Sequence, residues 1–86
     1  MNFHQMRYLC EVVRRGYNLS EAARALHTSQ PGISRQMRML EEEMGFPVLV
    51  RQGKRITGLT RQGELVLAAA KRLLAGTNGT YFSFLG

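Results

Sequence analysis

The sequence contains few of the residues on which catalytic and disulfide-stabilised proteins depend. It has one cysteine among 86 residues, so no disulfide can form within the chain. This residue, Cys10, lies on the apolar side of a helical pattern and is expected to be a small core residue. The two histidines, His4 and His27, have no cysteine, serine or carboxylate partner at a spacing that indicates a catalytic site, and no glycine-rich phosphate loop is present. We therefore expect no catalytic residues, no cofactor and no enzymatic activity.

Long apolar runs and acidic residues are also scarce. No apolar run approaches the length of about 20 residues that spans a bilayer, and the chain does not open with a signal-peptide pattern. A cytoplasmic protein without a membrane partner is therefore expected. Twelve Lys and Arg residues against six acidic residues give a net charge of +6. Such a surplus favours a polyanionic partner, either nucleic acid or an anionic membrane surface.

The segment from Ser20 to Met44 predicts two helices joined by a tight corner. Ser20 is a suitable N-cap for the first helix, and Ala23 is expected where the two helices cross. Ser29 is expected to cap the second helix, over residues 30–44, whose first turn accepts a proline because the missing amide proton has no helical partner there. The buried stripe of this second helix is predicted to be Ile33, Met37, Leu40 and Met44. Two short helices around a corner are typical of the helix-turn-helix motif.

Another helix is predicted before this pair. Asn2 is a suitable N-cap, and the helix is expected to end at Arg14-Arg15-Gly16, where basic residues suit a C-terminus and glycine suits the residue beyond it. Its inward face is predicted to be Phe3, Met6, Leu9, Cys10 and Val13.

The hydrophobic period changes after Gly45, which is expected to end the helix over 30–44. Residues 48–50 and 56–59 are short β-branched runs on either side of the turn candidate Gln52-Gly53-Lys54, and they predict a β-hairpin. Its tip is predicted to carry three cations and no acidic residue, namely Arg51, Lys54 and Arg55. Such a tip is either an ordinary solvated loop or, beside a helix-turn-helix, a wing that contacts phosphates.

Three consecutive acidic residues, Glu41 to Glu43, lie near the end of the helix over 30–44. Side chains that meet on a helix are three or four residues apart, so these carboxylates point in different directions. They are therefore interpreted as a solvated or ion-paired surface and not as a metal site.

The polar face of the second helix of the central pair suits the major groove of DNA. This groove admits one α-helix, and its base edges present donors and acceptors that glutamine, serine and arginine side chains can read. Gln30, Ser34 and Arg35 span little more than one helical turn, so they can face one groove together. Thr28 and Ser29 precede the free amides at the helix N-terminus and can bind a phosphate with them.

Two stretches of the chain resemble the N-terminal winged helix-turn-helix of LysR-type transcriptional regulators, SEAARALHTSQPGISRQMRMLEEEMG and VLVRQGKRITGLTRQGE. The similarity extends from Met1 to about Ala75. The opening segment and the hairpin resemble more closely the CysB/Cbl branch of this family, whose members regulate sulfur assimilation. The resemblance implies a bacterial transcription regulator that binds DNA and is located in the cytoplasm, on the nucleoid.

The resemblance also implies a fold and a set of contacts. The fold is mainly α, with a winged helix-turn-helix domain of three helices and a β-hairpin over residues 1–59, a linker helix over 60–76 and an irregular tail over 77–86. The helix over 30–44 is the recognition helix for double-stranded DNA, and the hairpin is the wing. The DNA-contacting residues that it implies are Thr28, Ser29, Gln30, Pro31, Ser34, Arg35 and Arg38 at the recognition helix and Arg51, Lys54 and Arg55 on the wing.

The last helix, which Thr60 can cap, is expected to pair with another chain. Leu65, Ala69 and Leu73 form an apolar face on it, and the resemblance implies that two such helices pack antiparallel in a homodimer. The family's effector-binding domain does not occur in these residues, so no small-molecule effector is expected in this fragment. In another interpretation the chain is an interaction module that pairs with full-length relatives and blocks them. A membrane-surface peptide is disfavoured because the cations do not form one amphipathic stripe.

Overall fold

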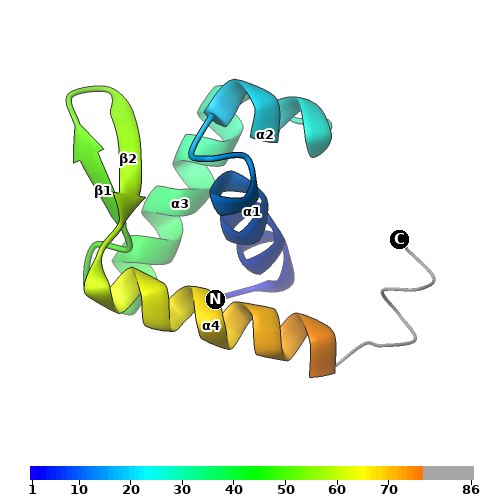
Figure 1. Cartoon of the computed structure of the whole chain (residues 1–86), viewed down its shortest axis with the longest axis vertical. Coiled ribbons are helices and arrows are strands. Elements are labelled where there is room, and N and C mark those ends of the chain that lie inside the picture. The colour runs from blue at the N-terminus through cyan, green and yellow to red at the C-terminus, as the bar shows by residue number, and fades with distance from the viewer. Residues whose placement is uncertain (77–86) are drawn as a thin grey trace.

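The computed structural model describes residues 1–76, which form a group of helices flanked by a β-hairpin (Figure 1). The predicted mainly α fold and the predicted order of its elements are confirmed. The elements in chain order are α1 (Phe3–Arg14), α2 (Leu19–Ala25), α3 (Gln30–Met44), β1 (Leu49–Gln52), β2 (Arg55–Leu59) and α4 (Arg61–Gly76). The predicted tail, with Tyr81, Phe82, Phe84 and Leu85, lies outside the described residues. Among residues 1–76, no helix combines the length and the apolar character needed to cross a membrane.

Side-chain caps fix where the helices begin. The Asn2 side chain accepts a hydrogen bond from the Gln5 amide at 2.8 Å, and the Gln5 side chain accepts one from the Asn2 amide at 3.1 Å. This reciprocal pair is a capping box at the start of α1. The Ser29 hydroxyl accepts from the Gly32 amide at 3.1 Å at the start of α3. Both predicted caps are therefore confirmed.

The prediction that Ser20 caps α2 is wrong. The cap is Asn18, whose side chain accepts from the Glu21 amide at 3.0 Å. Ser20 consequently lies inside the first turn of α2, with its hydroxyl free to contact another element. Asn18 and Ser20 are both good capping residues and are two positions apart. Asn18 takes the role because α2 begins at Leu19, so the Glu21 amide has no partner within the helix and bonds to the Asn18 side chain.

The corner between α2 and α3 is as tight as predicted, although no glycine marks it. His27 adopts a left-handed conformation with φ +54°. The His27 amide donates to the Arg24 carbonyl at 3.3 Å, and the Thr28 amide donates to the Ala23 carbonyl at 2.9 Å. This pair of bonds is a Schellman ending, in which a histidine occupies the position that glycine usually fills.

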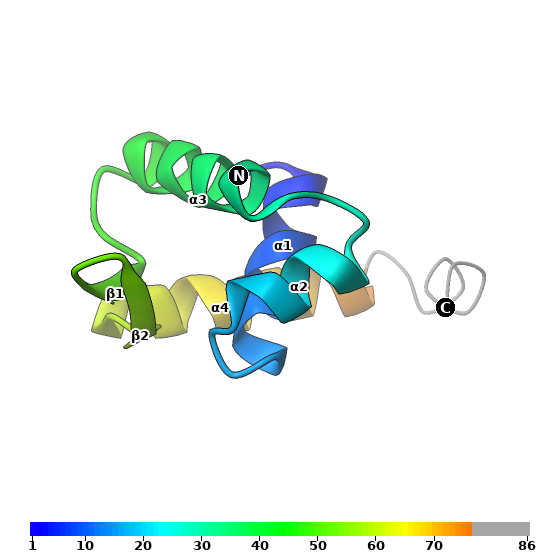
Figure 2. The same cartoon turned by 90° about the horizontal axis from the view of Figure 1, so that it is seen from above.

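The core is built around α1, which lies between α3 and α4 (Figure 2). Ala22 and Ala23 are buried where α2 packs on α1 and α3. The stripe predicted on α3 is confirmed except at Met44, which is only half-buried. The side chains with no exposed surface are Leu9, Val12, Ala22, Ile33, Met37, Leu40, Val48 and Ala70.

The face predicted for α1 is confirmed at Leu9 and in part at Val13, which is half-buried against the core, but it misses Gln5 and Val12. Gln5 and Val12 are buried beside Leu9, and the other predicted residues are only half-buried. Gln5 can be buried because its side-chain oxygen is satisfied by the capping box. Cys10 is among the half-buried residues, and this burial raises the pKa of its thiol, which therefore stays protonated at neutral pH.

The start of α4 is fixed against the segment that leads into β1. The Thr60 hydroxyl accepts from the Gly63 amide at 2.9 Å, which confirms Thr60 as the cap, and donates to the Pro47 carbonyl at 2.7 Å. A Cβ added to Gly63 would overlap the Val48 carbonyl. Only glycine therefore allows this close approach of helix and strand. Further along α4, the buried side chains are Val66, Ala70 and Leu74.

The predicted hairpin is confirmed, with strands that extend closer to the turn than predicted. β1 and β2 pair antiparallel, from Leu49 opposite Leu59 to Gln52 opposite Arg55. Gly53 has φ +63° in the turn. The register shifts between Val50 and Arg51, and this irregularity changes the direction of the side chains that follow it.

Candidate nucleic-acid interface

The first turn of α3 and the tip of the hairpin lie at the same end of the molecule (Figure 1). Between them is a cavity of about 340 Å³, which we call the wing hollow. Its lining residues come from the α1–α2 connection, the start of α2, the start of α3 and the hairpin, and none is acidic. They are Gly16, Tyr17, Asn18, Leu19, Ser20, Gln30, Lys54, Arg55 and Ile56.

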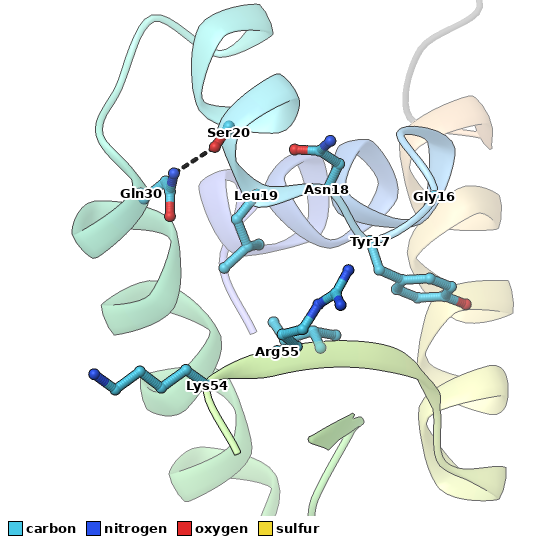
Figure 3. Close-up of a pocket in the computed structure, with 9 residues that line it drawn as sticks. Gly16, Tyr17, Asn18, Leu19, Ser20, Gln30, Lys54 and Arg55 are labelled. Carbon is cyan, nitrogen blue, oxygen red and sulfur yellow. Dashed lines mark hydrogen bonds between the residues drawn. The ribbon is translucent and has the colours of Figure 1, made fainter. Parts of the chain in front are cut away.

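Three predicted contact residues line the wing hollow. Lys54 and Arg55 extend from the hairpin, and Gln30 faces them from the first turn of α3 (Figure 3). All three are exposed. The wing hollow is thus a positively charged recess beside the recognition helix, and an anionic strand could enter it from solvent.

Four other predicted contact residues lie together along α3. They line an open groove of about 570 Å³, the α3 groove, with Met39 and Glu42. Pro31, Arg35 and Arg38 are exposed there, and Ser34 is half-buried. Because Gln30 and Pro31 are consecutive, the wing hollow and the α3 groove meet at the first turn of α3.

Thr28 and Ser29 lie against the backbone of that first turn. A Cβ added to Gly32 would lie 3.0 Å from the Thr28 hydroxyl oxygen and 3.1 Å from that of Ser29. The Ser29 oxygen already accepts the Gly32 amide, so its hydroxyl proton remains able to donate to an anion. The absent side chain of Gly32 thus keeps both hydroxyls close to the helix start.

Arg51 does not lie at the hairpin tip, and that prediction is wrong. The register shift directs its guanidinium to Glu41 on α3, with an N–O distance of 2.8 Å. The Glu41 carboxylate also accepts the amides of Val48 at 2.7 Å and Leu49 at 3.0 Å. Glu41 therefore joins the recognition helix to the base of the hairpin. A phosphate contact by Arg51 remains a prediction.

The ion-paired interpretation of the acidic triplet is confirmed for two of its members. Glu41 pairs with Arg51, and Glu43 pairs with the N-terminal amine. Glu42 is exposed. Within residues 1–76, no group of three or more histidine, cysteine or acidic side chains is placed to hold a metal ion.

The arginines and lysines fall into paired and unpaired groups. Arg14 and Arg15 pair with Glu11, Arg24 pairs with Glu21, and Arg51 pairs with Glu41. The cations of the wing hollow and the α3 groove make no ion pair within the described part of the chain, and they are Arg35, Arg38, Lys54 and Arg55. These four charges are therefore available to an external anion.

The three residues predicted for pairing lie on the outer side of α4. Leu65 is 70% exposed and Leu73 is 50% exposed, whereas Ala69 is half-buried. The adjoining stripe of α4, with Val66, Ala70 and Leu74, is buried and packs on the core. An apolar face thus remains uncovered within residues 1–76.

Two functional contacts had no signal in the sequence. The Gln30 side-chain amide donates a hydrogen bond to the Ser20 hydroxyl (Figure 3). Glu41 binds the hairpin base across ten positions to Arg51. Both contacts join elements whose relative placement follows from tertiary packing, which sequence spacing does not encode.

A helix-turn-helix with a hairpin wing and an open cationic face defines the class of winged helix-turn-helix proteins. Residues 3–64 match the family of bacterial regulatory helix-turn-helix proteins, lysR family, and the chain belongs to this family. The resemblance predicted from the sequence is therefore confirmed. The family is one of transcription regulators, so the chain is not an enzyme.

Named relatives agree with the predicted branch. CysB of Burkholderia cenocepacia is 49% identical over 74 residues, which are 86% of this chain and 24% of that protein. Cbl of Escherichia coli (strain K12) is 47% identical over 74 residues, which are 86% of this chain and 23% of that protein. The chain thus spans about a quarter of the length of these relatives. The crystal structure of a CbnR_DBD–DNA complex superposes with a TM-score of 0.79 at 42% identity and covers 92% of this chain and 91% of that chain.

Proposed function

We propose that this chain is the DNA-binding part of a LysR-type transcription regulator and binds double-stranded DNA with sequence selectivity. α3 enters the major groove, with Gln30, Ser34 and Arg35 at base edges and Pro31 beside them. Thr28, Ser29 and Arg38 contact the backbone next to the helix. The hairpin is the wing, and its cations Arg51, Lys54 and Arg55 contact phosphates.

The observation that carries this proposal is the distribution of unpaired charge. Eight of the lysines and arginines within residues 1–76 make no ion pair, and four of these, Arg35, Arg38, Lys54 and Arg55, line two adjoining recesses at the recognition helix. The structural similarity to CbnR_DBD, whose crystal structure is that of a complex with DNA, supports DNA binding by this chain.

The similarity to CysB and Cbl supports a finer proposal about the target genes. We infer that the regulated genes belong to sulfur assimilation and that the protein acts on the nucleoid, in the cytoplasm. The domain organisation follows the same pattern, with the winged helix-turn-helix over 1–59, the linker helix over 60–76 and a tail over 77–86.

A homodimer through α4 completes the proposal. The exposed Leu65 and Leu73 support it, because so large an apolar face is unfavourable in water. Two copies paired there would present two recognition helices to one side of a duplex. Sedimentation should show a weak dimer that DNA promotes. A strict monomer, with Leu73→Glu binding a two-half-site duplex as tightly as wild type, would contradict this.

The DNA proposal is tested by fluorescence anisotropy with a duplex selected from a randomised library. We expect the affinity to fall steeply with salt, and Gln30→Ala or Ser34→Ala to weaken the selected duplex by about 1–3 kcal/mol. A scrambled duplex should bind nearly as before. Equal affinity of wild type for both duplexes would contradict selective binding. Tight pairing with a full-length relative, without affinity for any duplex, would instead support the interaction module.

A further inference from the structure

The start of α2 and the start of α3 are joined by one side-chain contact. Gln30 Nε2 donates a hydrogen bond to Ser20 Oγ, and both residues line the wing hollow (Figure 3). Neither side chain is buried, so packing alone does not explain the contact. Ser20 is available for it because Asn18 caps α2 in its place.

The contact restricts a side chain that would otherwise be mobile. Gln30 is the first residue of α3, and an exposed glutamine has three rotatable torsions. Ordering such a side chain on binding costs about 0.5 to 1.5 kcal/mol. A glutamine held in place before it meets a ligand avoids most of that cost, which is the general advantage of preorganisation.

The contact also selects which amide groups remain free. Ser20 takes one of the two Nε2 hydrogens, so the other hydrogen and the Oε1 oxygen are left. In Figure 3 the Gln30 oxygen is turned away from Ser20. A donor and an acceptor side by side match the N7 acceptor and N6 donor of adenine in the major groove.

We propose that Ser20 is a positioning residue that holds the Gln30 amide in the orientation required to read a base. This inference rests on the proposed function, since it concerns the specificity of the same interface. Ser20 itself does not contact the base, and its effect passes entirely through Gln30.

The test compares wild type, Ser20→Ala, Ser20→Thr, Gln30→Ala and the Ser20→Ala/Gln30→Ala double variant. Each is measured against a selected duplex, its three single-base variants at the position where Gln30→Ala relaxes the preference, and a scrambled duplex. Ser20→Ala should reduce discrimination at that position by about three- to tenfold. Ser20→Thr retains the hydroxyl and should preserve discrimination. Binding to the scrambled duplex, the salt dependence and the melting temperature should not change.

The double variant separates positioning from an independent contact. If Ser20 acts through Gln30, adding Ser20→Ala to Gln30→Ala should have no further effect. Additive losses, or equal weakening of the selected and scrambled duplexes by Ser20→Ala, would overturn the inference. Unchanged discrimination in Ser20→Ala, with Gln30→Ala discriminating poorly, would overturn it as well and leave the proposed function intact. A wild-type chain that binds no duplex selectively would refute the proposed function itself.

Discussion

The two ends of the hairpin differ in how they are held. At the base, Glu41 accepts the amides of Val48 and Leu49, and Thr60 bridges the strand entry to α4. Gly63 lets the helix approach the Val48 carbonyl without an intervening side chain. The base is thus fixed to both α3 and α4.

At the tip, Gly53, Lys54 and Arg55 are exposed, and neither cation has an acidic partner within residues 1–76. The contrast indicates that the two ends of the hairpin have different roles. The base determines where the hairpin stands relative to α3, and the tip offers charge to a ligand. Changes at the base should therefore affect folding, and changes at the tip should affect DNA binding.

The largest effect is expected at the base, from Gly63→Ala. The new Cβ would overlap the Val48 carbonyl, which belongs to the backbone and cannot rotate away. We expect the free energy of unfolding to fall by about 3 kcal/mol in urea denaturation. Gly58→Ala is the control, since a Cβ there has no atom within 4 Å. Equal stability of the two variants would show that α4 does not depend on this close approach.

Glu41→Ala should have the next largest effect. It removes the acceptor of the Val48 and Leu49 amides and the partner of Arg51. Leaving partly buried donors unsatisfied should lower the free energy of unfolding by about 2 kcal/mol. The adjacent and exposed Glu42, changed to Ala, should alter it by less than about 0.5 kcal/mol. If thermal melting does not separate these two variants, Glu41 does not fasten the hairpin.

Arg51→Ala tests a residue that pairs with Glu41 at the base of the hairpin and is also proposed to contact a phosphate. The ion pair with Glu41 is partly exposed, so its loss should lower stability by only about 0.5 to 1 kcal/mol. Because Glu41 already neutralises this charge, the slope of log affinity against log salt should change less than for a tip cation. A slope change as large as that of Lys54→Ala would place Arg51 functionally with the tip.

Lys54→Ala should leave stability unchanged, within about 0.5 kcal/mol. It should weaken binding to selected and scrambled duplexes alike and flatten the salt slope by about one unit, because one phosphate contact is lost. Lys71→Ala removes the same charge from α4 and is the matched control. If both variants change the slope equally, the effect is one of net charge and the hairpin tip is an ordinary solvated loop.

Much of this architecture could be predicted because its signals are local. Ser29, Gly45 and Gly53 each act within one turn of the chain, and they mark the ends of α3 and the hairpin turn. Three residues of the wing hollow, Gln30, Lys54 and Arg55, could be named from the resemblance, but their convergence could not. It depends on how α2, α3 and the hairpin pack together.

Other features could not be predicted because they depend on distant or competing groups. The caps Asn18 and Ser20 compete two positions apart, and only the fold decides between them. Gln5 is polar, yet it is buried because the capping box satisfies its oxygen. The direction of the Arg51 side chain depends on the register shift after Val50, and no residue type in the sequence predicts that shift.

The most direct test is a nuclear magnetic resonance titration of the backbone amides with a selected duplex. It tests the claim that the hairpin tip binds DNA together with α3 while the hairpin base does not. The signals of Gly32 and Ser34 in α3 and of Gly53 and Lys54 at the tip should shift together and saturate at the same DNA concentration. The signal of Leu49, whose amide Glu41 holds at the base, should stay in place. Shifts confined to α4, or a tip that does not respond while α3 does, would contradict the claim that α3 and the hairpin form one DNA-binding surface.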